Sequence, residues 1–188
     1  MQHKPIWDTI ADEAAAESEL WASALLAASE REHVAVFSPL APGVLALGLE
    51  TIYEGYLMHY GRPRLFAAGD RDTRILLGDY LYAHGLVRVA EHGDTTLVAD
   101  LAELLSLCAQ LRAEAAPGEP VADGVLWAAT HALIGSPNGE LAEAREALRD
   151  HGDARPLAAL AERAAGDGAV ERAGALHAER TSVEMIDS

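Results

Sequence analysis

The pattern of apolar and polar positions predicts helices throughout the chain. No segment shows the long alternation of Val, Ile, Thr or aromatic residues with polar ones that is typical of a strand. Ala and Leu, which lose least on entering a helix, number 38 and 26 of the 188 residues. We therefore expect an all-α fold, with helices near residues 7–17, 19–34, 40–60, 73–92, 95–114, 121–135, 139–150, 155–165 and 168–180.

Prolines and glycines mark the breaks between these helices. Pro39 and Pro42 bracket the start of the 40–60 helix, and Gly61-Arg62-Pro63 ends it, because proline disfavours helical geometry in the preceding residue. Two junctions, Glu91-His92-Gly93-Asp94 and Asp150-His151-Gly152-Asp153, share another pattern. In each, the glycine can end one helix in the left-handed conformation and the aspartate can cap the next. We favour this capping interpretation over a pair of His/Asp metal sites.

The charge balance excludes several classes of function. Thirty acidic and fourteen basic side chains give a formal charge of −16, which argues against binding nucleic acid or an anionic membrane surface. No run of about 18 apolar residues predicts a membrane span, and the first residues lack an apolar signal core. The single cysteine, Cys108, cannot form an internal disulfide. We therefore expect a cytoplasmic protein.

The length is that of one domain, or at most two, and we expect a single all-α domain over residues 1–188. Residues 153–188 combine Ala, Glu, Arg and Gly with few large apolar side chains. This composition predicts short solvated helices, with a frayed end over 181–188. Phosphate loops, dinucleotide fingerprints, paired-cysteine zinc spacings and nucleophile elbows are absent from the sequence. We interpret Cys108, which lies among leucines on a helix, as a buried and inert thiol.

Residues 48–85 carry most of the candidate chemistry. Glu50 and Glu54 are four residues apart, so their carboxylates lie on one face of a helix. Gly78 lies inside a helical segment, where glycine costs about 1 kcal/mol relative to alanine. Close approach of a neighbouring helix, or room for a ligand, would compensate for this cost. Gly78 and Gly85 are seven residues apart and lie on one side of the helix.

This region resembles the trans-isoprenyl diphosphate synthases, the polyprenyl synthetase family. In that family an Asp-Asp-x-x-Asp helix is followed by Arg-Arg-Gly-x-Pro and then by a helix that opens Leu-Ala-Gly-Asp-Tyr-Leu. The resemblance covers about residues 45–150, and the matching segments here are Gly61-Arg62-Pro63, Leu76-Leu77-Gly78-Asp79-Tyr80-Leu81, Cys108-Ala109-Gln110 and Gly124-Val125-Leu126-Trp127. The resemblance implies a helical bundle of the isoprenoid-synthase type, truncated at its C-terminal end. It also suggests Gly78, Asp79, Tyr80 and Gln110 as pocket or interface residues.

The sequence departs from the family at its functional motifs. The first aspartate-rich motif falls on Glu50-Thr51-Ile52-Tyr53-Glu54, where Thr51 replaces the middle acid. The diphosphate-binding arginine pair falls on His59-Tyr60, with Arg62 and Arg64 just beyond, which makes these four the candidates on the diphosphate side. The second motif would fall on Leu160-Ala161-Glu162-Arg163-Ala164-Ala165, which holds no carboxylate cluster.

The departures change the expected function. Prenyl transfer needs a cluster of Mg²⁺ ions held by carboxylates from two facing helices. Carboxylates from only one of these helices cannot hold the ions. We expect Glu50 and Glu54 to bind Mg²⁺ only weakly or with a partner, no tightly bound cofactor, and no catalysis by the isolated chain. The resemblance implies a non-catalytic subunit that pairs with a catalytic prenyl diphosphate synthase chain, or with itself, and helps to set product length. The pairing helices would be those near 73–92 and 95–114.

Two alternatives remain from the sequence. One is a helical scaffold or apolar-ligand-binding protein unrelated to prenyl transfer. The other is a residual Mg²⁺-dependent prenyltransferase that uses Glu50, Glu54 and Asp79.

Overall fold

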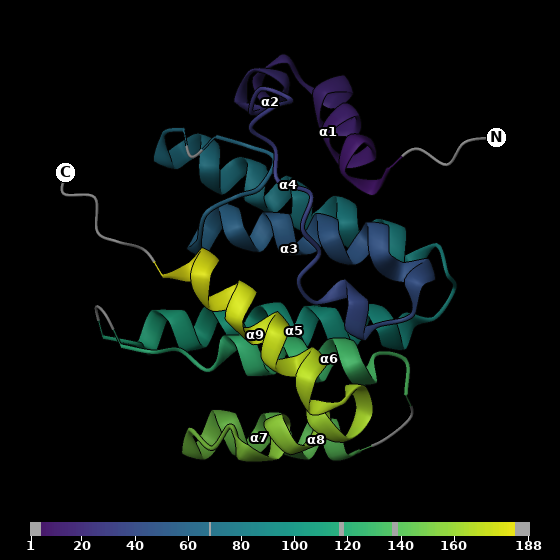
Figure 1. Cartoon of the computed structure of the whole chain (residues 1–188), viewed down its shortest axis with the longest axis vertical. Helices are drawn as coiled ribbons and strands as arrows, with labels where there is room; N and C mark the ends of the chain where they lie inside the picture. Colours follow the sequence, from purple (N-terminus) through teal and green to yellow (C-terminus); the bar gives the residue numbers. More distant parts are fainter. Residues whose placement is uncertain (1–4, 68, 117–118, 137–138, 183–188) are drawn as a thin grey trace. The chain divides into compact units, whose positions relative to one another are not determined.

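The computed structural model describes residues 5–67, 69–116, 119–136 and 139–182. These residues form α-helices and two short 3-10 helices, with a single isolated bridge between Leu25 and Phe66 and no strand among them. The prediction of an all-α fold is therefore confirmed. Figure 1 shows the helices along the chain, and their bounds are α1 Ile6–Glu17, α2 Glu19–Ala24, η1 Ser38–Leu40, η2 Gly43–Leu45, α3 Ala46–Tyr60, α4 Arg71–Ala90, α5 Thr95–Glu114, α6 Asp123–Leu133, α7 Glu140–His151, α8 Arg155–Ala165 and α9 Asp167–Thr181.

Most of the predicted helices are confirmed within a few residues, but the helix expected over 19–34 is wrong. Helix α2 ends at Ala24, and Leu25 is extended. The backbone from here pairs with a distant segment instead, because the amide of Leu26 donates to the carbonyl of Leu65 at 2.9 Å and the amide of Ala67 donates to that of Ala24 at 2.8 Å. Tertiary hydrogen bonds have overridden local helix propensity here.

The chain divides into two compact units. Unit 1 consists of Met1–Ala35, Val44–Arg88 and Glu179–Ser188, and unit 2 consists of Val36–Gly43 and Val89–Ala178. Two of the four boundaries between them fall inside α4 and α9. The expected single domain stays a prediction.

Unit 1 packs α1 against α2 and α3. Helix α3 is buried continuously over residues 48–58, so it has no solvent-facing side in that stretch. The apolar core beside it contains Trp7, Ile10, Ala14, Met58, Leu65, Phe66, Leu77 and Leu81. A helix that is buried all round must accommodate its polar side chains inside the protein.

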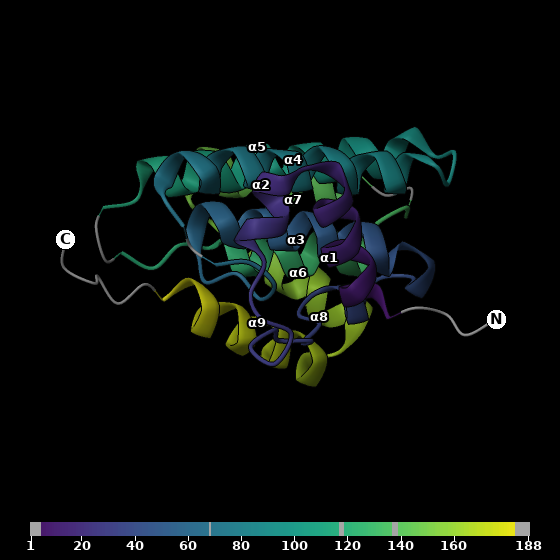
Figure 2. The same cartoon turned by 90° about the horizontal axis from the view of Figure 1, so that it is seen from above.

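Glycines bring α3 and α4 close together, and Figures 1 and 2 show the two helices running side by side. A Cβ on Gly85 would lie 2.5 Å from Cγ1 of Ile52 and 2.8 Å from the carbonyl oxygen of Gly48. A Cβ on Gly55 would lie 2.8 Å from the carbonyl oxygen of Gly78. Of the two expected compensations, close approach of a neighbouring helix is the one that the structure confirms, and the neighbour is α3.

Replacing Gly85 with alanine should lower the free energy of unfolding by about 2 kcal/mol. The added methyl group has no room against Ile52 and the backbone of Gly48, and this overpacking outweighs the helix propensity that alanine gains. Gly174, inside α9, is the matched control because a Cβ there meets nothing within 4 Å. Gly174→Ala should raise stability by about 0.5–1 kcal/mol in the same urea denaturation measurement. Equal effects at the two glycines would contradict this packing.

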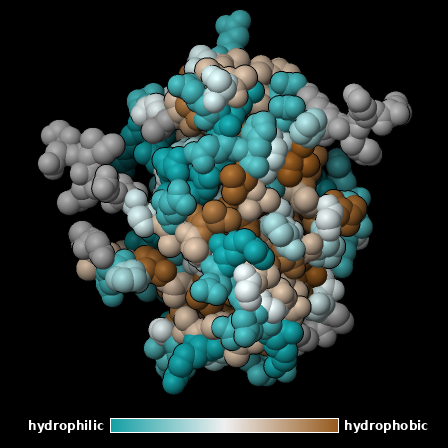
Figure 3. All heavy atoms as spheres, in the orientation of Figure 1, coloured by the Kyte–Doolittle hydropathy of each residue, from teal (hydrophilic) through white to brown (hydrophobic). Residues whose placement is uncertain are grey.

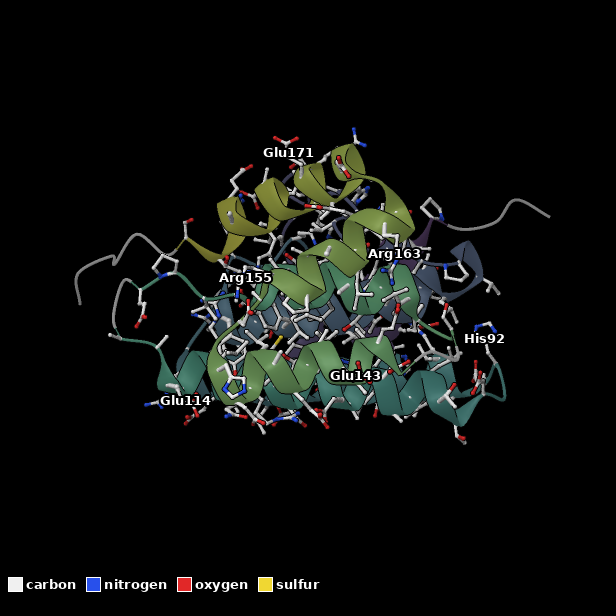
Figure 4. The ribbon with its side chains drawn as sticks, turned by 90° about the horizontal axis from the view of Figure 1, so that it is seen from below. His92, Glu114, Glu143, Arg155, Arg163 and Glu171 are labelled. Atoms are coloured by element: carbon white, nitrogen blue, oxygen red, sulfur yellow. The ribbon has the colours of Figure 1, made fainter. Side chains whose placement is uncertain are left out.

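Unit 2 is organised around α6, which contacts α5, α7, α8 and η1. Trp127 of α6 is fully buried and its ring lies 5.7 Å from that of Phe37. The helices over 155–181, expected to be short and solvated, each bury one face, through Leu157, Leu160 and Ala161 in α8 and Ala173 and His177 in α9. Figure 4 labels exposed side chains of this unit on α5, α7, α8, α9 and the turn after α4. Residues 183–188, within the expected frayed end, lie outside the described residues.

The capping interpretation of the two His-Gly-Asp junctions is confirmed for Asp94, which is the N-cap of α5, whereas at the second junction the N-cap of α8 is Ala154 and Asp153 lies one residue before it. Gly93 and Gly152 have φ of 78° and 64°, in the left-handed region. The carboxylate of Asp94 accepts the amide of Thr96 at 2.8 Å, and that of Asp153 accepts the amide of Arg155 at 3.0 Å. Hydrogen bonds from Arg155 lower the pKa of Asp153 to about 2. Each aspartate therefore stabilises the helix that follows it.

The surface of the described residues carries scattered apolar side chains. Figure 3 shows hydrophobic atoms interspersed among hydrophilic ones on one face. The large apolar side chains that are exposed are Leu20, Val44, Ile75, Leu76 and Val87. No helix in the described part of the chain combines the length and apolar character needed to cross a bilayer.

Candidate functional site

Glu50 and Glu54 lie inside unit 1, on the buried stretch of α3, with 1% and 0% of their surface exposed. As the sequence predicts, they share one face of the helix. Burying two carboxylates is costly unless a cation and hydrogen-bond donors accompany them. The cation here is Arg64, from the segment that follows α3, and its side chain is fully buried.

The guanidinium of Arg64 joins the two carboxylates. Its Nε donates to Oε2 of Glu54 at 2.8 Å, and its Nη1 donates to Oε2 of Glu50 at 2.5 Å. The other carboxylate oxygen of Glu54, Oε1, accepts the backbone amides of Arg64 and Leu65, both at 2.8 Å. Nη1 also donates to the carbonyl of Val34 at 2.8 Å, and Nη2 donates to that of Glu50 at 3.3 Å. We call Glu50, Glu54 and Arg64 the buried ion cluster.

Two aromatic rings complete the surroundings of Arg64. The central guanidinium carbon lies 4.7 Å from the ring centroid of Trp7 and 5.1 Å from that of Tyr53. Burial alone would lower the pKa of Arg64, but the charges and hydrogen bonds of Glu50 and Glu54 outweigh it and raise the pKa above its ordinary value. The guanidinium is therefore permanently charged, and it is fixed in place by the carboxylates, the carbonyl oxygens and the two rings.

The residues of the buried ion cluster do not fit the Mg²⁺ that the family resemblance implies. Mg²⁺ requires near-octahedral oxygen ligands and usually keeps several waters. Here the guanidinium lies between the two carboxylates, backbone amides bind Glu54, and the site is buried and flanked by aromatic rings. Within the described residues there is also no group of three or more His, Cys, Asp or Glu side chains placed to hold a metal ion.

Thr51, next to Glu50 in the sequence, contributes to packing between helices of unit 1. Its hydroxyl donates to the carbonyl of Leu47 at 2.7 Å and accepts from Nη1 of Arg88 at 2.7 Å. Arg88 also pairs with Glu13 of α1. This position therefore links α1, α3 and α4.

His59 and Gly78, proposed for different roles, are in direct contact. A Cβ on Gly78 would lie 2.5 Å from Nε2 of His59, so this glycine makes room for the imidazole. Nε2 lies 3.2 Å from Oδ1 of Asp79, an electrostatic contact rather than an aligned hydrogen bond. Burial lowers the pKa of His59. The nearby carboxylate of Asp79 offsets only part of this shift. The ring also stacks on Tyr82 with centroids 5.1 Å apart.

The remaining candidates are distributed over both units. Tyr60 contacts the ring of Tyr56 at 5.1 Å, and Tyr80 stacks on His84 at 5.4 Å. Gln110 lies on α5 of unit 2, where its side chain donates to Glu114 at 3.0 Å. Cys108 is buried, as expected, and burial raises its pKa well above the usual value.

Arg62 belongs to an ion-pair network that the sequence did not predict. It pairs with Glu32, which also accepts from Nη2 of the buried Arg180 at 2.7 Å. The backbone amide of Arg62 donates to the carbonyl of Arg180 at 2.9 Å. Glu32 and Arg180 are 148 positions apart and Arg62 and Glu32 are 30 apart, so no local pattern could have indicated these pairs.

A second buried polar cluster, also missed from the sequence, lies in unit 2. Asp123 is 1% exposed and accepts from Nε of Arg112 at 2.6 Å and from its own neighbour Gly124 at 2.9 Å. Nε2 of His177 lies 3.2 Å from its Oδ1. The single signal in the sequence is Asp123 at the start of a helix, which indicates capping rather than a buried partner.

Comparisons with protein-family models, curated proteins and solved structures found no significant match to this chain.

Proposed function

We propose that this chain is a non-catalytic member of the polyprenyl diphosphate synthase family, which pairs with a catalytic chain and helps to set product length. The observation that carries the proposal is the buried ion cluster. Glu50 and Glu54 stand where the resemblance puts the metal-binding acids, and both bind Arg64 instead. Carboxylates held in this way cannot stabilise a departing diphosphate through Mg²⁺. This arrangement also argues against the residual Mg²⁺-dependent enzyme.

The exposed face of α4 supports pairing with another chain. Leu76 and Val87 are 56% and 58% exposed, and their spacing of eleven residues places them on one side of the helix, together with the exposed Ala83. Within the two helices expected to pair, near 73–92 and 95–114, other apolar side chains are less available for pairing, since Leu77, Leu81, Leu97, Leu101, Leu104 and Leu107 are all buried. A charge at Leu101 would therefore damage the fold rather than the pairing.

Mixing this chain with a prenyl diphosphate synthase that keeps both aspartate motifs, from the same organism, tests the proposal. We expect a stable complex by sedimentation, with an interface above about 2,000 Å², and a change in the length of the partner's prenyl product. The chain alone should give no multiple-turnover product. The double variant Leu76→Glu/Val87→Glu should weaken the complex at least about tenfold, which is about 1.4 kcal/mol.

Val44→Glu is the matched control, because Val44 is 69% exposed and lies outside α4. It should leave both the complex and the product length unchanged. A stable monomer at micromolar concentration, with no effect on any intact synthase, would contradict the proposal and favour a helical scaffold or apolar-ligand-binding protein.

A further inference from the structure

We infer that Glu50 and Glu54 form a binding site for a planar guanidinium group, and that Arg64 is the ligand that the chain itself supplies. The inference concerns this site alone and needs no partner chain. Its experiment therefore distinguishes its failure from a failure of the proposed function.

The acceptors match the shape of a guanidinium. Nε of Arg64 donates to the carboxylate of Glu54, and Nη1 donates to that of Glu50. The carbonyl oxygens of Val34 and Glu50 accept two further N–H groups of the same guanidinium. Such a set of acceptors suits a rigid fork of N–H donors, whereas an ammonium presents its donors from one point.

The rings of Trp7 and Tyr53 add selectivity for an organic cation. Their centroids lie 4.7 and 5.1 Å from the guanidinium carbon, within the range of cation–π attraction. Aromatic faces offer nothing to a strongly hydrated divalent ion, which needs oxygen ligands or water in those directions. The site therefore favours guanidinium over Mg²⁺ by its geometry as well as by its burial.

The site should keep its shape when the side chain of Arg64 is removed. Glu54 is held by the backbone amides of residues 64 and 65, which any substitution except proline retains. Glu50 and Tyr53 lie on the buried stretch of α3, and Trp7 belongs to the apolar core. An Arg64→Ala variant thus leaves two carboxylates and two rings around a space that lacks its cation.

Chemical rescue of Arg64→Ala tests the inference. N-ethylguanidinium replaces the missing atoms beyond Cβ, and at about 20 mM the denaturing effect of a guanidinium salt is negligible. We expect it to raise the melting temperature of Arg64→Ala saturably, by about 3 °C or more, because it binds only the folded state. Urea, ethylammonium and Mg²⁺ at the same concentration should give less than a third of this shift. Wild type and Arg155→Ala, in which an exposed arginine is lost, should not respond to N-ethylguanidinium.

The double variant Glu54→Gln/Arg64→Ala should lose most of the rescue. If Arg64→Ala does not fold on expression, the yield of refolded protein with each additive replaces the melting temperature. Arg64→Lys, which keeps the charge without the planar fork, should be markedly less stable than wild type. The inference is overturned by a Mg²⁺ rescue equal to that by N-ethylguanidinium, by no rescue at all, or by an Arg64→Lys variant as stable as wild type.

Discussion

Replacing Arg64 with methionine should lower the free energy of unfolding by about 3–5 kcal/mol, the largest effect that we expect from a single substitution in this chain. The substitution retains an unbranched side chain but removes the cation that faces Glu50 and Glu54. Breaking a buried ion pair from one side leaves charge without compensation, which costs far more than the intact pair contributes. Urea denaturation followed by circular dichroism measures this difference.

Removing the charges together should relieve most of this loss. In Glu50→Gln/Glu54→Gln/Arg64→Met no charge of the buried ion cluster remains, and the amide oxygen at position 54 can still accept the backbone amides of residues 64 and 65. We expect this triple variant to be more stable than Arg64→Met by about 2 kcal/mol or more. Arg155→Met, at a side chain that is 90% exposed, should change stability by less than about 0.5 kcal/mol. A triple variant no more stable than Arg64→Met would contradict the role assigned to the buried charges.

Acidification should destabilise the protein through His131 of unit 2 by about 3 kcal/mol. This imidazole is 1% exposed, its Nδ1 donates to the carbonyl of Trp127 at 2.9 Å, and its Nε2 has no hydrogen-bond partner among the described residues. Burial lowers the pKa of His131 from 6.5 to about 4, and the hydrogen bond to Trp127 offsets little of this. Between pH 6.5 and 4 the unfolded chain binds a proton that the folded chain resists, so stability is full above pH 6.5 and declines towards pH 4.

The variant His131→Phe isolates this contribution, because it keeps a ring against Phe37 and Trp127 and cannot be protonated. The free energy of unfolding of wild type should fall more steeply than that of His131→Phe over this pH range. His151→Phe, at an exposed position at the end of α7, should follow wild type. If the free energy of unfolding depended on pH in the same way for wild type and His131→Phe, His131 would have the same pKa in the folded and the unfolded chain, which contradicts this prediction.

The close packing of α3 and α4 illustrates what a sequence pattern can reveal about contacts. Gly78 and Gly85 indicate either a close neighbouring helix or room for a ligand, because glycine inside a helix is costly unless something requires the space. The pattern could not identify the neighbour, nor predict that the space at Gly78 is occupied by His59. The spacing of glycines along one helix shows which side of that helix is closely packed. Which element packs against that side depends on contacts between residues distant in sequence.

The helical class, most helix bounds to within a few residues, and the cap at Asp94 follow from local sequence, because helix propensity, proline, glycine and capping act over a few neighbouring residues. The sequence also placed Glu50 and Glu54 on one face of a helix. Two features depend instead on contacts between distant segments: α2 ends at Ala24, where the backbone pairs with residues 65–67, and Arg64 joins the two glutamates. Two buried carboxylates four residues apart can face a metal ion, a ligand or an arginine. Which of these they face depends on the segment that folds against them, and here that segment supplies Arg64.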